Sequence, residues 1–289
     1  MIVITGATGK LGGHVVNALL QTVPASELAV AVRTPSRAAH LAARGVQVRE
    51  ADYDRPDTLV HALRAGEKVL LISANEVGKR APQHANVIAA ARAAKVGLLV
   101  YTSLLHADSS RLLLAEEHRA TEEAVRTSGL PFVILRNGWY FENHTEQIGA
   151  LLERGTIIGA AGSGRFASAS REDYAAAAAA VLTSDEHVNR TYELSGDSSF
   201  TMQDFAAELS KAAGRRIEYT DLLPEQYSQA LVQAGFPPFV ADLFVDFDLG
   251  ARRGDLDDGS GTLRRLIGRP TTTLRAAIAA ALKSEAPAR

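Results

Sequence analysis

The sequence contains no cysteine, which excludes disulfide bonds, thiolate catalysis and zinc–thiolate sites. Aromatic residues are few, at 6% of the chain, and there is a single tryptophan. An excess of either charge is also missing, because 31 Lys and Arg residues are matched by 33 Asp and Glu residues. The resulting net charge of −2 gives no indication of a nucleic acid or an anionic membrane as a partner.

Long hydrophobic runs are absent as well. The longest apolar run is Tyr174–Leu182, whereas a membrane-spanning helix needs about 20 apolar residues. A strand-like run begins at residue 2 and leaves no room for a signal peptide, so we expect a soluble cytoplasmic protein. A chain of 289 residues can form one large domain or two unequal ones, and the sequence leaves a homo-oligomer open.

Strand-like and helical patterns alternate through the first half of the chain. Strands are expected at Ile2–Ile4, Leu28–Val32, Val46–Val48, Val69–Ile72, Gly97–Tyr101 and Phe132–Leu135. Helical patterns after the second to fifth of these runs cover Ser36–Arg44, Pro56–Leu63, Ala81–Ala94 and Leu112–Thr127. The alternation predicts an α/β fold with a doubly wound, mostly parallel sheet, and such sheets bind ligands at the carboxyl ends of their strands.

The second half of the chain has a weaker pattern and predicts a smaller C-terminal α/β lobe. Arg171–Leu182 is so rich in alanine that we expect this helix to pack closely on the sheet, followed by a strand at Tyr192–Leu194. Thr201 and Asp204 have the spacing of a helix-capping pair. The last residues, Ser284–Arg289, are expected to form a frayed tail.

A glycine-rich turn joins the first strand to the first helix. Its G-x-x-G-x-x-G spacing differs from the common dinucleotide fingerprint, but the flanking strand and helix are those of a dinucleotide-binding unit. Gly6 permits a sharp turn, Gly9 permits close approach of a pyrophosphate, and Gly12 permits close packing of the helix. The predicted cofactor-binding residues here are Gly6, Ala7, Thr8, Gly9, Lys10, Leu11 and Gly12; an ordinary tight turn is the alternative.

Arg33 follows the second strand, at the position where proteins that prefer NAD carry an acidic residue. A guanidinium at this position pairs with a 2′-phosphate, so we predict a preference for NADP, with a surface arginine as the alternative. The remaining predicted cofactor contacts are Asp52 near the adenine, Ser73 and Asn75 beside the ribose, and Thr102 and Ser103 at the nicotinamide end. For Asp52, a role at the start of the next helix is an equal alternative.

The sixth strand runs into a segment that combines the only tryptophan with two further aromatic residues and two asparagines. Aromatic rings with a few polar groups suit a planar ligand. The predicted substrate-binding residues are Asn137, Trp139, Tyr140, Phe141 and Asn143. The alternative is an apolar cluster beneath a loop.

The tyrosine–lysine pair of many reductases is also missing. In that pair a lysine four residues after the tyrosine lowers the pKa of the phenol, which then protonates the substrate. None of the seven tyrosines of this chain has a lysine at that spacing, so we assign no catalytic residue. His118 lies in the helix where the pair would stand, and on this charged helix a solvated surface histidine is favoured over a catalytic one. We expect no metal site.

Several segments, including ITGATGKLG, VGKRAPQHANVI, YTSLLHADSS and LRNGWYFEN, are similar to the NmrA-like branch of the atypical short-chain dehydrogenases/reductases. The resemblance covers nearly the whole chain, and within the branch it is strongest to bacterial NADPH:quinone oxidoreductases. It implies NADPH as cofactor, a small quinone as substrate, and hydride transfer without flavin. It also implies a Rossmann domain at 1–135 and a substrate-side lobe at 136–289, with residues 171–195 returning to the Rossmann sheet.

Two other functions remain open from the sequence. NmrA-like proteins include dinucleotide-binding redox sensors that do no chemistry and hold a protein partner, and the missing tyrosine–lysine pair fits such a sensor equally well. A sugar-nucleotide epimerase is disfavoured, because that chemistry requires deprotonation of a sugar hydroxyl. We therefore expect a reductase, and turnover with a quinone separates it from a sensor.

Overall fold

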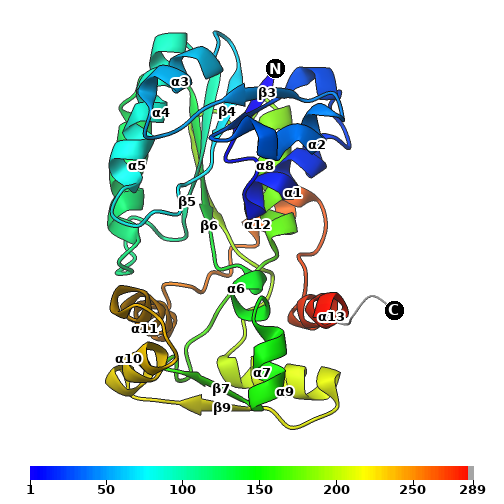
Figure 1. Cartoon of the computed structure of the whole chain (residues 1–289), viewed down its shortest axis with the longest axis vertical. Helices are drawn as coiled ribbons and strands as arrows, with labels where there is room; N and C mark the ends of the chain where they lie inside the picture. Colours follow the sequence, from blue (N-terminus) through cyan, green and yellow to red (C-terminus); the bar gives the residue numbers. More distant parts are fainter. Residues whose placement is uncertain (286–289) are drawn as a thin grey trace. The chain divides into compact units, whose positions relative to one another are not determined.

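The computed structural model describes residues 1–285 and divides into two compact units (Figure 1). The Rossmann unit comprises Met1–Asp108, Leu114–Asn137 and Arg171–Glu193. The smaller unit comprises Ser109–Leu113, Gly138–Ser170 and the residues from Leu194 onward. Residues 286–289 lie outside the described part, and with them most of the predicted frayed tail; Ser284 belongs to the last helix.

Within residues 1–285 the Rossmann sheet has seven strands in the order β3-β2-β1-β4-β5-β6-β8. The strands are β1 Ile2–Thr5, β2 Leu28–Val32, β3 Gln47–Glu50, β4 Lys68–Leu71, β5 Leu98–Leu104, β6 Phe132–Asn137 and β8 Arg190–Leu194. All neighbours from β3 to β6 pair in parallel. The predicted doubly wound α/β sheet is confirmed, and its strand order reverses direction between β1 and β4, where such sheets bind ligands.

Helices follow most of these strands. They are α1 Lys10–Leu19, α2 Ala39–Ala42, α3 Pro56–Ala62, α4 Arg80–Ala94, α5 Ala115–Arg126 and α8 Arg171–Thr183. The helix expected over Ser36–Arg44 is instead a 3₁₀ turn at Pro35–Ala38 followed by the single-turn α2. Proline at the start of α3 fits the first helical turn, where its missing N–H has no intrahelical role.

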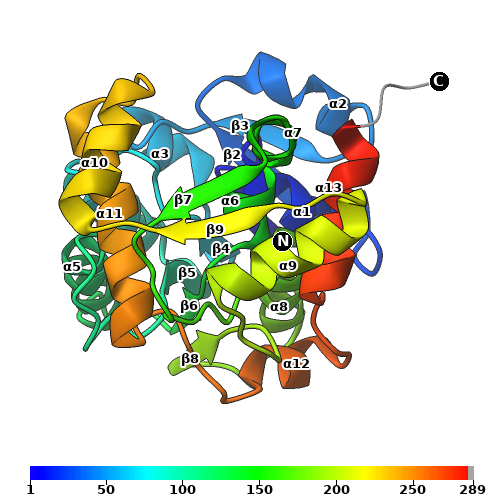
Figure 2. The ribbon, with the colours of Figure 1, turned by 90° about the horizontal axis from the view of Figure 1, so that it is seen from below.

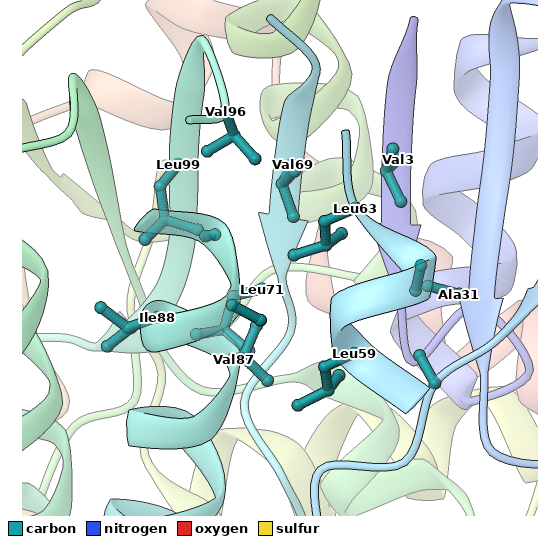
Figure 3. Close-up of a cluster of buried hydrophobic side chains, with 14 of the residues drawn as sticks. Val3, Ala31, Leu59, Leu63, Val69, Leu71, Val87, Ile88, Val96 and Leu99 are labelled. Atoms are coloured by element: carbon teal, nitrogen blue, oxygen red, sulfur yellow. The ribbon is translucent and has the colours of Figure 1, made fainter. Parts of the chain in front are cut away.

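A cluster of buried aliphatic side chains covers one face of the sheet (Figure 3). Val3, Val69 and Leu99 project from neighbouring strands, and Leu59 of α3 and Val87 of α4 pack against them. All five side chains are at most 1% exposed. Burial of apolar surface stabilises the fold by about 25 cal/mol per Å². The packing of these side chains therefore holds in place the strand ends from which the site is built.

The alanine-rich helix α8 lies against α1, as Figure 1 shows. Its Ala175, Ala177 and Ala178 are fully buried. Small side chains on this helix allow close approach of the two helices, so a segment distant in sequence completes the Rossmann unit.

In the smaller unit, β7 (Thr156–Gly159) and β9 (Glu218–Asp221) form a two-stranded parallel sheet (Figure 2). The helices of this unit are α6 Phe141–Thr145, α7 Ile148–Arg154, α9 Met202–Ala213, α10 Pro224–Gln233, α11 Pro238–Arg253, α12 Thr262–Ile267 and α13 Leu274–Glu285. Thr201 and Asp204 form the predicted capping box at the start of α9. No helix within residues 1–285 is long and apolar enough to cross a membrane.

Candidate active site

The glycine turn occupies the carboxyl end of β1. Gly6 has a φ of +60°, which glycine adopts without strain, and Gly9 is the N-cap of α1. A Cβ on Gly12 would lie 2.4 Å from the Gly6 carbonyl oxygen, so a larger residue cannot keep α1 this close to the turn. No side chain caps the N-terminus of α1, and its first turn holds no acidic residue. This positive helix end fits the pyrophosphate of a dinucleotide.

Thr5 and Tyr53 join three strand ends beneath the turn. The Thr5 hydroxyl donates to the Leu70 carbonyl at 2.9 Å and accepts from the Ile72 N–H at 3.1 Å. The Tyr53 hydroxyl contacts the Thr5 hydroxyl and donates to the Ile72 carbonyl. Burial raises the pKa of Tyr53, so its hydroxyl stays protonated and serves as a structural donor.

Arg33, directly after β2, is largely exposed, and its guanidinium lies 3.8 Å from the Glu76 carboxylate. Glu76 also bonds the Lys79 ammonium at 2.9 Å. The pKa of Glu76 is lowered, chiefly by its hydrogen bond with Lys79 and also by the charge of Arg33. The exposed guanidinium fits a 2′-phosphate, and sequence reasoning did not foresee its acidic neighbour.

Asp52, Ser73 and Asn75 have different surroundings. One Asp52 carboxylate oxygen accepts from the Asp54 N–H at 3.1 Å, so the side chain supports the turn that leads into α3. The Ser73 N–H donates to the Thr102 hydroxyl at 2.9 Å and so links the ends of β4 and β5. Asn75 is exposed. Their roles as cofactor contacts remain predictions.

Three side chains that sequence reasoning did not single out fix the segment after β4. His84 Nε2 accepts the Ala74 N–H at 3.0 Å, and Arg80 Nε donates to the Ala74 carbonyl at 2.6 Å. Glu117 accepts the N–H groups of Gly78 and Arg80, each at 3.0 Å. Burial lowers the pKa of His84 to about 3, so the ring is neutral and its Nε2 is free to accept. No local sequence signal identifies these partners, which come from two different helices.

His118 corrects an expectation from the sequence. Its side chain is not on the surface but 5% exposed, and its Nδ1 lies 2.7 Å from the Tyr101 hydroxyl. Burial lowers the pKa of His118 to about 3. Most of the charged residues of α5 lie on its outer face, whereas this histidine lies on the buried face together with Glu122.

Thr102 and Ser103 lie inside β5 rather than after it, because that strand continues to Leu104. The Ser103 hydroxyl donates to Glu122 at 2.6 Å, and Glu122 is also held by Arg136 at 2.8 and 2.9 Å. Burial alone would raise the pKa of Glu122, but the hydrogen bonds from Arg136 and Ser103 lower it. The Ser103 hydroxyl is therefore engaged in a buried ion-pair network.

The predicted substrate-binding segment divides between the two units. Asn137 ends β6 in the Rossmann unit, whereas Trp139 to Asn143 belong to the smaller unit. Trp139 and Tyr140 are half-buried, and the Trp139 ring lies 4.6 Å from the ring of Phe247. Asn143 is exposed.

The structure corrects the prediction for Phe141. Its ring is 2% exposed and stacks on Phe200 at 5.7 Å, within an aromatic core that includes Phe166 and Phe205. The ring therefore packs inside the smaller unit, as in the apolar-cluster alternative. Within residues 1–285, no group of three or more His, Asp or Glu side chains is placed to hold a metal ion.

The doubly wound sheet, the glycine turn and the arginine after β2 define a dinucleotide-binding protein of the Rossmann type. Residues 6–185 match the NAD(P)H-binding family, and the chain belongs to the NmrA-like members of that family. An NmrA-like family domain-containing oxidoreductase of Aspergillus flavus is 30% identical over 95% of this chain and 92% of its own length.

Two bacterial comparisons show a higher sequence identity to this chain. Quinone oxidoreductase 2 of Escherichia coli is 52% identical over 95% of this chain and 96% of its own length. The crystal structure of an NADPH-dependent quinone oxidoreductase from Escherichia coli, complexed with NADPH, is 51% identical with a TM-score of 0.95. That alignment covers 98% of this chain and 100% of the crystallised chain. This protein is thus a homologue of NADPH-dependent quinone oxidoreductases.

Proposed function

We propose that this protein is a cytoplasmic NADPH-dependent quinone oxidoreductase that works by direct hydride transfer, without flavin or metal. The observation that carries the proposal is the 52% identity to quinone oxidoreductase 2 over 95% of the chain. The glycine turn and the exposed Arg33 support it independently, because they are the groups that an NADP-type dinucleotide requires.

The Rossmann unit supplies the cofactor site in this proposal. Backbone N–H groups between Gly6 and Gly12 hold the pyrophosphate at the start of α1, and Arg33 binds the 2′-phosphate. Ser73 and Asn75 lie beside the ribose, and Thr102 holds the Ser73 backbone in place. When bound, NADPH supplies the hydride, and the residues of the chain bind and orient both reactants.

On the substrate side, we propose that Trp139 and Tyr140 offer apolar ring surface to the quinone. Asn137, Tyr140 and Asn143 are the candidate hydrogen-bond donors to the quinone oxygen. Quinones are strong acceptors, so donors that stabilise the developing negative charge can replace the missing tyrosine–lysine acid. Holding the reactants in a fixed geometry supplies much of the rate.

Oxidation of NADPH by the purified protein, followed by absorbance with and without a small quinone, tests this function. We expect NADPH loss that depends on the quinone, with NADH as the poorer donor. Tight NADPH binding without turnover on any of several quinones would instead identify a redox sensor, and the experiment would then move to the search for a protein partner.

A further inference from the structure

An ion pair in the Rossmann unit crosses the carboxyl end of β1. In the sheet order, β1 lies between β2 and β4. Arg33 directly follows β2, and Glu76 lies in the segment that follows β4, yet their charged groups are 3.8 Å apart. The two side chains therefore bridge the carboxyl end of β1.

A bound dinucleotide with a 2′-phosphate would need the same guanidinium. In a Rossmann sheet the adenosine half of the cofactor runs from the turn after β1 toward the end of β2. Arg33 cannot form optimal hydrogen bonds with the Glu76 carboxylate and with a 2′-phosphate at the same time, because both anions bind the same guanidinium N–H donors. An NADP-type cofactor would therefore compete with Glu76 for Arg33, whereas a cofactor that has no 2′-phosphate would leave the pair intact.

The segment that carries Glu76 is anchored. Ala74, two residues before Glu76, is held by His84 and Arg80, and the end of the segment is held by Glu117 through the Gly78 and Arg80 N–H groups. The backbone is therefore held on both sides of Glu76, and this fixes the position from which its side chain reaches Arg33. When the carboxylate leaves Arg33 it still has Lys79, 2.9 Å away, as a partner.

We propose that Glu76 is a specificity-determining residue that competes with the 2′-phosphate of the cofactor for Arg33. It weakens the binding of NADPH and of NADP⁺ and leaves the binding of NADH nearly unchanged. Glu76 therefore moderates the preference that Arg33 creates, and it speeds the release of the oxidised cofactor. This inference rests on the proposed function.

The test is the affinity of Glu76→Gln for NADPH, NADP⁺ and NADH, measured by calorimetry at low salt and without quinone. Exposed ion pairs are weak, so we expect NADPH and NADP⁺ to bind ~2–5-fold more tightly and NADH to change less than about 1.5-fold. High salt should reduce the gain. In an Arg33→Ala background the same substitution should have no effect, because the competitor has lost its target.

Glu50→Gln is the matched control, since Glu50 is the last residue of β3, at the same edge of the sheet, but pairs with Arg55 instead of Arg33. Equal tightening of NADPH and NADH by Glu76→Gln, unchanged or weaker NADPH binding, or a gain that survives Arg33→Ala would each overturn the inference. Failure of the proposed function looks different, because the unaltered protein would then bind no NADPH or turn over no quinone.

Discussion

In the proposed site, Arg33 is the residue that we expect to decide cofactor preference. Its guanidinium is exposed directly after β2, and it makes a weak ion pair with the carboxylate of Glu76 at 3.8 Å. A charged group with so few fixed partners remains available to a phosphate dianion, and charge-assisted hydrogen bonds are the stronger class of such contacts.

Replacing Arg33 with alanine should weaken NADPH binding by roughly 1.5–3 kcal/mol, the usual loss for hydrogen bonds to a charged group. NADH binding should hardly change, since NADH has no 2′-phosphate. Calorimetric titration with both cofactors measures the difference. Arg55→Ala, which removes an arginine paired with Glu50, is the matched control. Equal weakening of both cofactors would argue against the 2′-phosphate assignment.

At the scale of elements, helix α11 is linked to the loop after β7 by a half-buried carboxylate. Asp248 on α11 accepts the Ala160 N–H at 2.6 Å. Burial raises the pKa of Asp248 to about 6, against 3.8 for the free group. The folded state therefore holds the proton more tightly than the unfolded chain does.

The raised pKa of Asp248 makes the stability of the protein depend on pH. The contribution of Asp248 is fully favourable below about pH 4 and is lost as the pH rises through 6, because the folded state must then bury a charge. Asp248→Asn keeps an acceptor oxygen and removes the charge, so it should stabilise the protein at pH 7 by about 1–2 kcal/mol.

Near pH 4 the gain from Asp248→Asn should vanish. Urea unfolding at the two pH values measures it, with the exposed Asp242→Asn on the same helix as the control. A gain of equal size at both pH values would mean that charge burial is not its cause.

At the scale of the whole molecule, two histidines within residues 1–285, His84 and His118, are buried in the neutral form, and a third, His144, is half-buried. Burial lowers the pKa of His84 and of His118 to about 3, and that of His144 to about 4. The first two lie in the Rossmann unit, and His144 packs among phenylalanine rings of the smaller unit. Acid therefore acts on both units.

Because these pKa values are lowered on folding, the unfolded chain takes up protons first as the pH falls below about 6.5. Each histidine then costs at most about 1.4 kcal/mol per pH unit, so stability should fall by several kcal/mol between pH 6.5 and 4.5. Urea unfolding across this range measures the loss. His84→Gln should flatten the dependence, whereas the exposed His14→Gln should not; a stability that is flat with pH would contradict the prediction.

Most of the sheet was predictable because strands such as Leu28–Val32 are continuous apolar runs, which encode their own burial. The ends of β5 and β6 were placed too early, since Ser103 and Asn137 are polar residues inside strands. Ser103 is acceptable there because Glu122, from a helix, accepts its hydroxyl. Local sequence patterns carry no information on such distant partners.

The sequence by itself determined the α/β class, the glycine turn at the start of α1 and the cationic residue after β2, because each depends on neighbours along the chain. Only the tertiary structure decided that His118 and Phe141 are buried and that Glu76 meets Arg33 across the end of β1. These facts depend on side chains that are brought together by strand order and helix packing, and no local spacing encodes them.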